Sequence, residues 1–512
     1  MAISPRLQGL IPIVMLLLAG CGITLSLAPF NIWPAAIIAL MVLFHYQHQA
    51  LGKQRFFYPM IFSSALFISG CYWIYISMNT FGGAPPPLAL IMTLMFCLFI
   101  AILIPPFMMV YHRYFSSLPA ILRALAFASL WMLSEWLRTW FLTGFPWMFI
   151  GYSQTLGWLN SWAPIIGTLG ISFLLALTAA LVVELLQAIK QQRKALPMLC
   201  ISAILICIWV SPLALNPLTF THNKSDKTYK VALVQPDIDL KHKWDPRFLY
   251  DDMQYHRQVS NDMPEQDIII WPETAVALMY HQSQYFLSLL NDDAQKNNTA
   301  IILGIPSKWN KNGHKVYHNS MIGVGQASGI YHKQKLVPFG EFVPFEKQLR
   351  GLIQFFDLPL SEFRPGPSNQ QPFTAKGLMV MPYICYEIVY PDFVAKTAGD
   401  SDVLVTVSND AWFGDSIGPL QHLQMVQMRA LESGRYILRG TNTGVTAVIN
   451  PDGQIIDQLP QFERGVLKSQ VYARDGLTPM ARFGSKPILF FSLLILLTAA
   501  LYRFQQSPHK PQ

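Results

Sequence analysis

The feature of this chain that most restricts its fold is a set of eight long apolar runs, seven before residue 215 and one after residue 485. A helix that crosses a bilayer needs about 20 mostly apolar residues, and each run approaches that length. We therefore expect an α-helical membrane bundle of eight spans with one large domain outside the bilayer. The runs cover residues 8–26, 29–46, 57–77, 88–111, 118–140, 162–188, 196–214 and 487–503.

The charged residues are concentrated between the seventh and eighth runs. Only 13% of the chain is charged, whereas an average soluble protein has about a quarter. Residues 221–485 hold 27 of the 29 acidic and 25 of the 37 basic residues, a net charge of −2, and the flanks carry +10. Because this excess lies between apolar runs, where it orients spans, the basic pI is no sign of nucleic-acid binding.

Nine of the twelve basic residues outside the central segment fall in alternating loops. They are Arg6, Lys53, Arg55, Arg113, Lys190, Arg193, Lys194, Arg503 and Lys510. Since such residues stay on the cytoplasmic side, both termini are predicted to be cytoplasmic. We expect seven helices in 1–214, a domain in 215–485 on the opposite side of the membrane, which in a bacterium is the periplasm, and the eighth helix with a cytoplasmic tail in 486–512. A cleavable signal peptide is the alternative for the first run, but more runs follow it directly.

Two ionisable residues lie inside the fifth run, near its outer end. Glu135 and Arg138 are spaced as an i,i+3 pair on a helix face that points into the bundle. Structural support and a part in shaping a lipid cavity both remain open for this pair.

Cys385 is the one cysteine of six that lies outside the apolar runs. The central domain therefore has no partner for a structural disulfide. Cys385 is either an inert buried thiol or a nucleophile. The sequence has no C-x-x-C pair and no His-rich cluster, so we expect no metal and no cofactor.

The central domain alternates short, β-branched apolar runs with helical patterns. This alternation predicts an α/β domain in which helices cover the faces of a sheet. We expect strands at 229–238, 266–274, 299–306, 318–325, 377–387, 401–410 and 444–453, and helices near 247–261, 281–296 and 418–434.

Three reactive side chains follow apolar strands of this domain. They are Glu273 in "IIIWPET", Lys333 or Lys335 in "YHKQKLVPF" and Cys385 in "YICYE". We expect them to converge at one edge of a sheet, where α/β proteins place their sites. A carboxylate can take the proton of a thiol, an ammonium group with a backbone N–H can stabilise an oxyanion, and a thioester can store an acyl group.

The same segments resemble a known superfamily. The stretches "WPET", "YHKQKLVPFGEFVP", "ICYE" and "SNDAWFG" are similar to motifs of the nitrilase superfamily, whose triad is Glu-Lys-Cys in that order. Seven apolar runs before this domain and one after it, with "LTGFPW", "QHLQMVQMRALE" and "TNTGVTAVI", narrow the resemblance to the apolipoprotein N-acyltransferase family. The match covers nearly the whole chain.

This resemblance implies an αββα sandwich attached to an eight-span bundle. It implies transfer of the sn-1 acyl chain of a phospholipid, typically phosphatidylethanolamine, through a Cys385 thioester. The acceptor is the N-terminal amine of a diacylglyceryl-cysteine apolipoprotein. One site that serves two substrates in turn predicts ping-pong kinetics.

The resemblance also assigns residues. The pattern Tyr-x-Lys-x-x-Leu-Val-Pro selects Lys333 and leaves Lys335 as an exposed neighbour. Glu341 matches a second carboxylate that holds the lysine or tunes the base, with an ordinary salt bridge as the alternative. Tyr386 and Glu387 flank the nucleophile, and Glu387 is expected to orient the backbone.

Three aromatic residues beside turn signals complete the expected site. The resemblance places Trp244, Trp412 and Phe413 on loops beside the lipid entrance, and caps on the domain core are the alternative.

Two other functions are compatible with parts of the sequence. A membrane-tethered amidase would use water as its acceptor. A transporter would need spans broken by Gly or Pro or carrying ionisable residues at mid-depth, and the runs hold little of either.

Overall fold

The structure, a computed structural model, describes residues 5–192, 194–311, 314–338, 340–342 and 363–506. Contacts within the chain divide it into two units, each described by itself. The helical unit is Met1–Tyr75, Pro87–Thr219 and Phe483–Gln512, and the sheet unit is Ile76–Pro86 and Phe220–Arg482.

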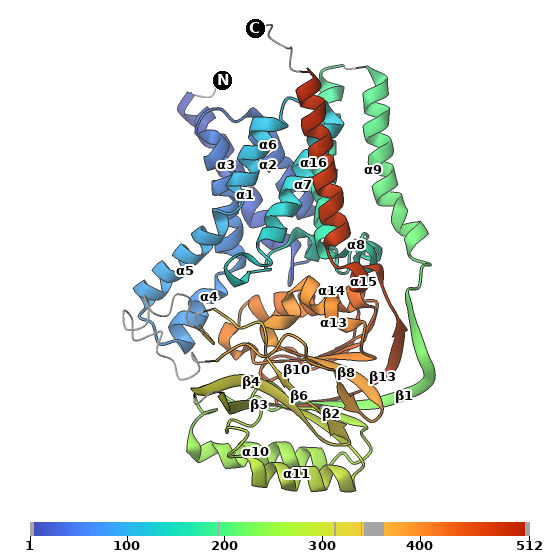
Figure 1. Ribbon diagram of the computed structural model, residues 1–512. Coiled ribbons are helices and arrows are strands. Elements are labelled where there is room, and N and C mark those ends of the chain that lie inside the picture. Colours follow the sequence, from blue (N-terminus) through green and yellow to red (C-terminus); the bar gives the residue numbers. More distant parts are fainter. Residues whose placement is uncertain (1–4, 193, 312–313, 339, 343–362, 507–512) are drawn as a thin grey trace. The chain divides into compact units, whose positions relative to one another are not determined.

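The helical unit consists of long apolar helices. Among the described residues, six helices are long and apolar enough to cross a membrane, and seven if one bent pair counts as a single span. Eight spans therefore remain a prediction. The main helices are α1 (Pro5–Ser26), α2 (Pro34–Gln49), α3 (Gln54–Gly70), α5 (Pro86–Ala101), α6 (Pro105–Tyr114), α7 (Ala120–Leu137), α8 (Ala163–Lys190), α9 (Ala195–Leu215) and α16 (Lys486–Gln506) (Figure 1).

Two of the predicted runs are not single straight helices. In the run at 57–77, α3 ends at Gly70, and Trp73–Phe81 continues at an angle of 50°. In the run at 88–111, α5 ends at Ala101 and α6 begins at Pro105. Proline has no backbone N–H to donate to the preceding turn, so it interrupts a continuing helix. It is tolerated in the first turn of α6, where the N–H would have no partner within the helix.

The expected pairing of Glu135 with Arg138 is wrong. Glu135 Oε1 accepts a hydrogen bond from the Ile150 N–H (3.0 Å). Arg138 donates to the Trp147 carbonyl (2.7 Å), and its guanidinium lies over the Phe149 ring (4.8 Å). Both side chains therefore hold the loop that follows α7, and no direct ion pair joins them within the described residues.

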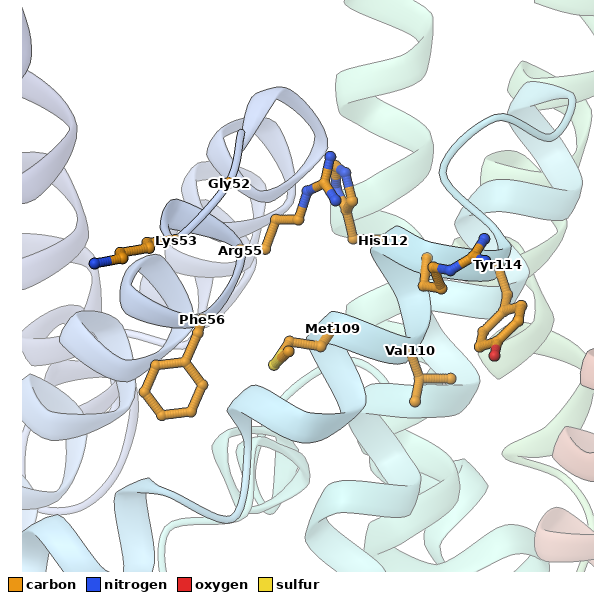
Figure 2. A pocket seen from close by; sticks show the side chains of 9 residues that line it. Gly52, Lys53, Arg55, Phe56, Met109, Val110, His112 and Tyr114 are labelled. Atoms are coloured by element: carbon orange, nitrogen blue, oxygen red, sulfur yellow. The ribbon is translucent and has the colours of Figure 1, made fainter.

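One end of α3 and one end of α6 border a hollow of about 480 Å³, which we call the basic hollow (Figure 2). It is lined by Gly52, Lys53, Arg55, Phe56, Met109, Val110, His112, Arg113 and Tyr114.

The sheet unit contains two β-sheets. The first has the strand order β13 (Gly465–Gly476), β1 (Thr221–Gln235), β2 (Ile268–Ile270), β3 (Ala300–Lys311), β4 (His314–Gly325) and β6 (Ile330–His332). The second has the order β12 (Ile455–Gln458), β11 (Ala447–Ile449), β10 (Ile437–Thr441), β9 (Val403–Ser408), β8 (Leu378–Ile384), β7 (Phe373–Ala375) and β5 (Ala327–Ser328). The centre of each sheet is parallel, β1–β2–β3 and β8–β9–β10.

Helices cover the outer face of each sheet, as the alternating pattern predicts. Helices α10 (Pro246–Asn261) and α11 (Gln284–Lys296) lie on the first sheet, and α13 (Pro391–Ala398) and α14 (Gly418–Ser433) lie on the second (Figure 1). The resulting order of layers confirms the expected αββα sandwich. Local signals delimit these helices: Asp245 caps α10 through the Arg247 N–H, and Gly434 ends α14 at a φ of 63°.

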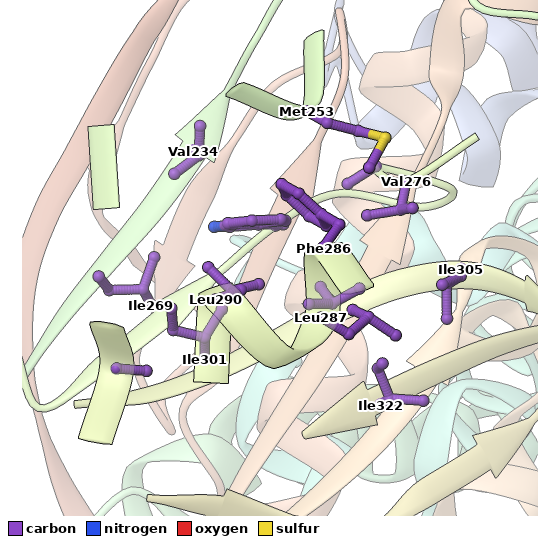
Figure 3. Close-up of a cluster of buried hydrophobic side chains, with 14 of the residues drawn as sticks. Val234, Met253, Ile269, Val276, Phe286, Leu287, Leu290, Ile301, Ile305 and Ile322 are labelled. Atoms are coloured by element: carbon purple, nitrogen blue, oxygen red, sulfur yellow. The ribbon is translucent and has the colours of Figure 1, made fainter. Parts of the chain in front are cut away.

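A buried apolar cluster joins α10 and α11 to the first sheet (Figure 3). Phe286, Leu287 and Leu290 of α11 face Ile269 and Ile301 of the strands beneath. Full burial of one such side chain stabilises the fold by about 1.5–3 kcal/mol. Between the two sheets a small residue permits close contact, since a Cβ added at Gly440 would lie 3.2 Å from Ile270 Cγ2.

The predicted strands omit β5, β6, β7, β10, β12 and β13, of which β10 and β13 are the longest. Strand β10 has the sequence "ILRGT", in which Arg439 interrupts the apolar run although it is fully buried. Strand β13 is the edge strand beside β1 in the described sheet, and only three of its twelve residues are buried, so it lacks a continuous apolar signal.

Candidate active site

The three residues expected to act together each follow a strand of the sheet unit. Glu273 comes three residues after β2, Lys333 comes directly after β6, and Cys385 comes directly after β8. We expected one edge of a single sheet, and this is wrong: β2 and β6 belong to the first sheet and β8 to the second. The site is therefore built where strand ends of both sheets meet.

Four groups hold Glu273. Its Oε1 accepts a hydrogen bond from Asn319 Nδ2 (2.7 Å) and lies 3.6 Å from Lys333 Nζ. Its Oε2 accepts from the Asn409 N–H (2.8 Å), and its backbone carbonyl accepts from Lys243 Nζ (2.8 Å). Glu273 is only 8% exposed, so these donors hold its carboxyl group in place inside the protein.

Lys333 is 1% exposed and lies between two carboxylates. Its Nζ is 2.9 Å from Glu341 Oε2, closer than to Glu273. Burial lowers the pKa of Lys333, but the charges of Glu341 and Glu273 outweigh this and raise it above its ordinary value. The lysine is therefore a fixed cation, and Glu341 is the group that binds it most closely.

Cys385 begins a short 3₁₀ turn, Cys385–Val389, with a φ of 53°. A non-glycine residue in this left-handed region stores about 1–3 kcal/mol of strain, which the surrounding contacts must hold. Burial raises the pKa of the Cys385 thiol, the charge of Glu273 raises it further, and the charge of Lys333 lowers it. Both charged groups thus act on this sulfur, and the net effect keeps the resting thiol protonated.

Glu387 ties the segment that carries the lysine to the segment that carries the cysteine. Its buried carboxyl group accepts hydrogen bonds from both segments. Burial raises the pKa of Glu387 to about 7. The donors are Tyr331 Oη (3.0 Å), Gln334 N (2.6 Å), Lys335 N (3.2 Å) and Ile384 N (2.7 Å). Lys335 is partly buried, with its Nζ over the Tyr390 ring (5.2 Å), so the expectation of an exposed neighbour is wrong.

Replacement of Glu387 by glutamine is expected to loosen this junction. An amide has one acceptor oxygen and presents N–H groups to donors, so at least one buried N–H loses its partner. We expect a loss of about 1–3 kcal/mol in the free energy of unfolding and slower acylation of Cys385. Thermal unfolding of the full chain measures the first, with exposed Glu463→Gln as the control. Equal stability of the two variants would contradict this role.

A buried polar network lies behind Cys385. Ser408 Oγ is 3.4 Å from Cys385 Sγ and is also bonded to Asp410. Asp410 in turn binds Arg439 and His422 Nδ1 (3.2 Å). Burial raises the pKa of the Asp410 carboxyl, but the charges of Arg439 and His422 lower it well below its usual range. The network therefore fixes a charged aspartate one hydroxyl away from the sulfur.

Sequence reasoning assigned no role to this network, nor to Asn319 or Lys243. A signal for part of it exists in "VLVTVSND", where three polar residues end an otherwise apolar strand. Asn319 and Lys243 carry no comparable signal, because only the fold brings them to Glu273.

Trp244 and Trp412, two of the residues expected to contact lipid, differ from each other in their surroundings. Trp244 is 37% exposed and follows Lys243 directly in the chain. The Trp412 carbonyl accepts from Ser77 Oγ (2.7 Å), and the Trp412 ring packs on Phe81 (6.1 Å).

Phe413 and Tyr386 pack within the sheet unit. The Phe413 ring lies against His422 (6.4 Å), and Tyr386 packs edge-on against Tyr390 (5.3 Å). Phe413 is partly exposed, as is Trp412, whereas Tyr386 is buried. A place for Trp412 and Phe413 beside a lipid entrance remains a prediction.

Substitution of Gly304 in β3 tests how accurately Glu273 must be positioned. A Cβ at this position would lie 2.5 Å from Thr274 N and 2.8 Å from Glu273 Cα, which are backbone atoms. We expect Gly304→Ala to shift Glu273 and slow acylation of Cys385 about 100-fold, as a 1 Å misplacement can. Gly465→Ala, whose Cβ would make an ordinary 3.4 Å contact with Leu459, is the matched control. Unchanged acylation in Gly304→Ala would show that the carboxylate position is not critical.

The described residues contain no group of three or more His, Cys, Asp or Glu side chains that could hold a metal ion.

An αββα sandwich with a carboxylate, a lysine and a cysteine at its strand ends defines a carbon–nitrogen hydrolase domain of the nitrilase superfamily, and the Carbon-nitrogen hydrolase family model matches residues 230–475. The model of the apolipoprotein N-acyltransferase N-terminal domain matches residues 19–181. The chain belongs to the apolipoprotein N-acyltransferase family, as its relatives show.

Curated relatives with that name align over almost the full chain. The protein of Pseudomonas putida is 42% identical over 94% of this chain and 95% of its own length. That of Pseudomonas aeruginosa is 41% identical over 96% of both chains. That of Coxiella burnetii is 35% identical over 95% of this chain and 99% of its own.

Proposed function

We propose that this chain transfers the sn-1 acyl chain of a phospholipid, typically phosphatidylethanolamine, to the N-terminal amine of a diacylglyceryl-cysteine apolipoprotein. The transfer passes through a thioester on Cys385 in a ping-pong reaction. The observation that carries the proposal is the ion-paired cluster of Glu273, Lys333 and Glu341, in which Glu273 and Lys333 are buried and their charges act on the Cys385 sulfur. The names of the relatives supply the acceptor class.

In the first half-reaction Glu273 takes the thiol proton as the sulfur attacks the ester carbonyl carbon of the phospholipid. A base is needed because the raised pKa of Cys385 leaves little thiolate at neutral pH. Lys333 and the N–H of Tyr386 stabilise the oxyanion. Its collapse breaks the ester C–O bond, and the proton on Glu273 passes to the departing lysophospholipid oxygen.

In the second half-reaction the apolipoprotein amine attacks the thioester carbon. Glu273 accepts a proton from the amine, an amide bond forms, and the C–S bond breaks. The sulfur leaves as a thiolate next to Lys333 and regains a proton from Glu273. Glu341 and Glu387 act as positioning residues, because they bind the lysine and join its segment to the cysteine turn.

The same proposal includes the membrane arrangement. Eight spans would place residues 215–485 in the periplasm and both termini in the cytoplasm of a bacterial inner membrane, with domains at 1–214, 215–485 and 486–512. Both substrates carry acyl chains that water disfavours by about 0.8 kcal/mol per CH₂. Membrane helices in the same chain keep the enzyme where these substrates are found. Trp244, Trp412 and Phe413 would contact the incoming acyl chains.

Intact mass of the full chain after exposure to phosphatidylethanolamine tests the proposal. We expect one added acyl group on Cys385 and one lysophospholipid released for each. Addition of a diacylglyceryl-cysteine peptide should then move the acyl group from protein to peptide. Release of free fatty acid without acylated peptide would identify a hydrolase and reject the transferase assignment.

A further inference from the structure

The basic hollow of the helical unit has the composition of an anion site. Lys53, Arg55 and Arg113 line it together with His112, and none of its nine lining residues is acidic. In Figure 2 the Arg55 side chain extends from α3 toward His112 of α6. Three cations and no carboxylate in one hollow favour a ligand that carries negative charge.

One hydrogen-bond donor at this hollow lacks a partner in the described part of the protein. Arg55 Nε is buried and has no hydrogen-bond partner among the described residues. Glu184, a buried acid of the helical unit, is bonded to Arg123 Nε (2.6 Å) and therefore compensates another cation. An anion with several oxygen acceptors would satisfy the buried guanidinium N–H and offset the unpaired charge.

The position of the hollow along the helices matches the level of lipid headgroups. It lies at the first residues of α3 and the last residues of α6, where two candidate spans end. Arg503 of α16 adds a fourth cation there, since it donates to the Arg113 carbonyl and lies over the Tyr114 ring (5.6 Å). Basic and aromatic residues at span ends are typical of the membrane interface.

The apolar part of the lining continues toward the lipid. Met109 and Val110, one turn before the end of α6, are 44% and 40% exposed. The volume of about 480 Å³ is within the range of about 300–1,000 Å³ found for small-ligand sites. A soluble anion would leave this apolar surface uncovered, whereas the acyl chains of a lipid would cover it.

We propose that the basic hollow binds the phosphodiester headgroup of an anionic phospholipid. Arg55 and Arg113 would bind the phosphate oxygens, and Met109 and Val110 would contact the acyl chains. The inference does not depend on the acyl-transfer mechanism, because these residues belong to the helical unit and the Glu273–Lys333–Cys385 cluster belongs to the sheet unit.

Native mass spectrometry of the full chain in mild detergent tests this site, with Cys385→Ala in every protein so that no lipid is consumed. Phosphatidylglycerol is the probe and phosphatidylethanolamine the zwitterionic comparison. We expect Arg55→Gln/Arg113→Gln to weaken phosphatidylglycerol binding roughly twenty-five-fold, since each basic residue near a charged lipid contributes about fivefold. Arg55→Lys/Arg113→Lys should bind within about threefold of the parent, and exposed Lys190→Gln should not change binding.

A salt titration of the parent protein keeps the test decisive if the double variant misfolds. Binding of phosphatidylglycerol should weaken as NaCl rises, because salt screens partly exposed charges, and phosphatidylethanolamine retention should not. Equal retention of both lipids at all salt concentrations would overturn the proposal. Full displacement of phosphatidylglycerol by millimolar inorganic phosphate would overturn it too, since the hollow would then bind a free anion.

Discussion

Replacement of Cys385 by alanine is expected to abolish both the acyl-enzyme and the transfer of acyl groups to peptide. The thioester cannot form without the sulfur, and no other cysteine lies within the described part of the sheet unit. Loss of a nucleophile that acts with a base removes covalent catalysis entirely, with losses on the order of 10⁶ in kcat. Intact mass after incubation with phospholipid should show the unmodified chain.

Cys385→Ser distinguishes the role of the sulfur from that of its position. Serine has a side chain of similar shape and can keep the contact with Ser408, so the thermal unfolding temperature should stay close to that of the parent. Its hydroxyl is a far weaker nucleophile than a thiol, so acylation should be lost. Cys200→Ala, an exposed cysteine of α9, is the control and should acylate normally. A normal acyl yield in Cys385→Ser would show that the nucleophile is elsewhere.

Replacement of Glu273 by glutamine is expected to slow acylation of Cys385 by a factor of about 10²–10⁴, the usual contribution of a general base. The amide keeps the size of the side chain and can still accept a hydrogen bond from Asn319 or the Asn409 N–H. It cannot accept the thiol proton. The measurement is the rate at which acyl mass appears on the full chain.

The pH dependence of this variant separates a base from a structural carboxylate. Without Glu273 only the thiolate reacts, and its fraction grows with pH because burial raises the pKa of the Cys385 thiol. The Glu273→Gln rate should therefore rise about tenfold per pH unit, whereas the parent rate should be flatter. Glu265→Gln, which removes an exposed carboxylate paired with Lys468, should leave both rate and profile unchanged. A flat profile in Glu273→Gln would reject the role of base.

The elements of the sheet unit could be predicted where their signals are local. The helices at 246–261 and 418–433 begin and end close to their expected residues, because capping groups and apolar periodicity lie within the segments themselves. Strand β10 was missed because it contains Arg439, and an arginine in a strand normally indicates solvent. It is buried here because Asp410, 29 residues away, compensates its charge.

In the helical unit, too, features with local signals could be predicted and features that depend on distant contacts could not. Long apolar runs predict helices, but the break after Gly70 and the start of α6 at Pro105 depend on how neighbouring segments pack. Glu135 and Arg138 have the spacing of an ion pair, yet the loop at 147–150 offers both of them backbone partners.

By itself the sequence determined the long apolar helices and the α/β class of the central domain, because composition and periodicity are local properties. Its resemblance to a known family selected Glu273, Lys333 and Cys385 as the candidate reactive residues. Only the tertiary structure decided that the site joins two sheets and that Asn319, Lys243 and the Ser408–Asp410 pair support it. These contacts link residues that are tens to more than a hundred positions apart in the chain. No local pattern encodes such pairs, since they arise from the packing of strands and loops that are distant in the chain, both within the first sheet and between the two sheets.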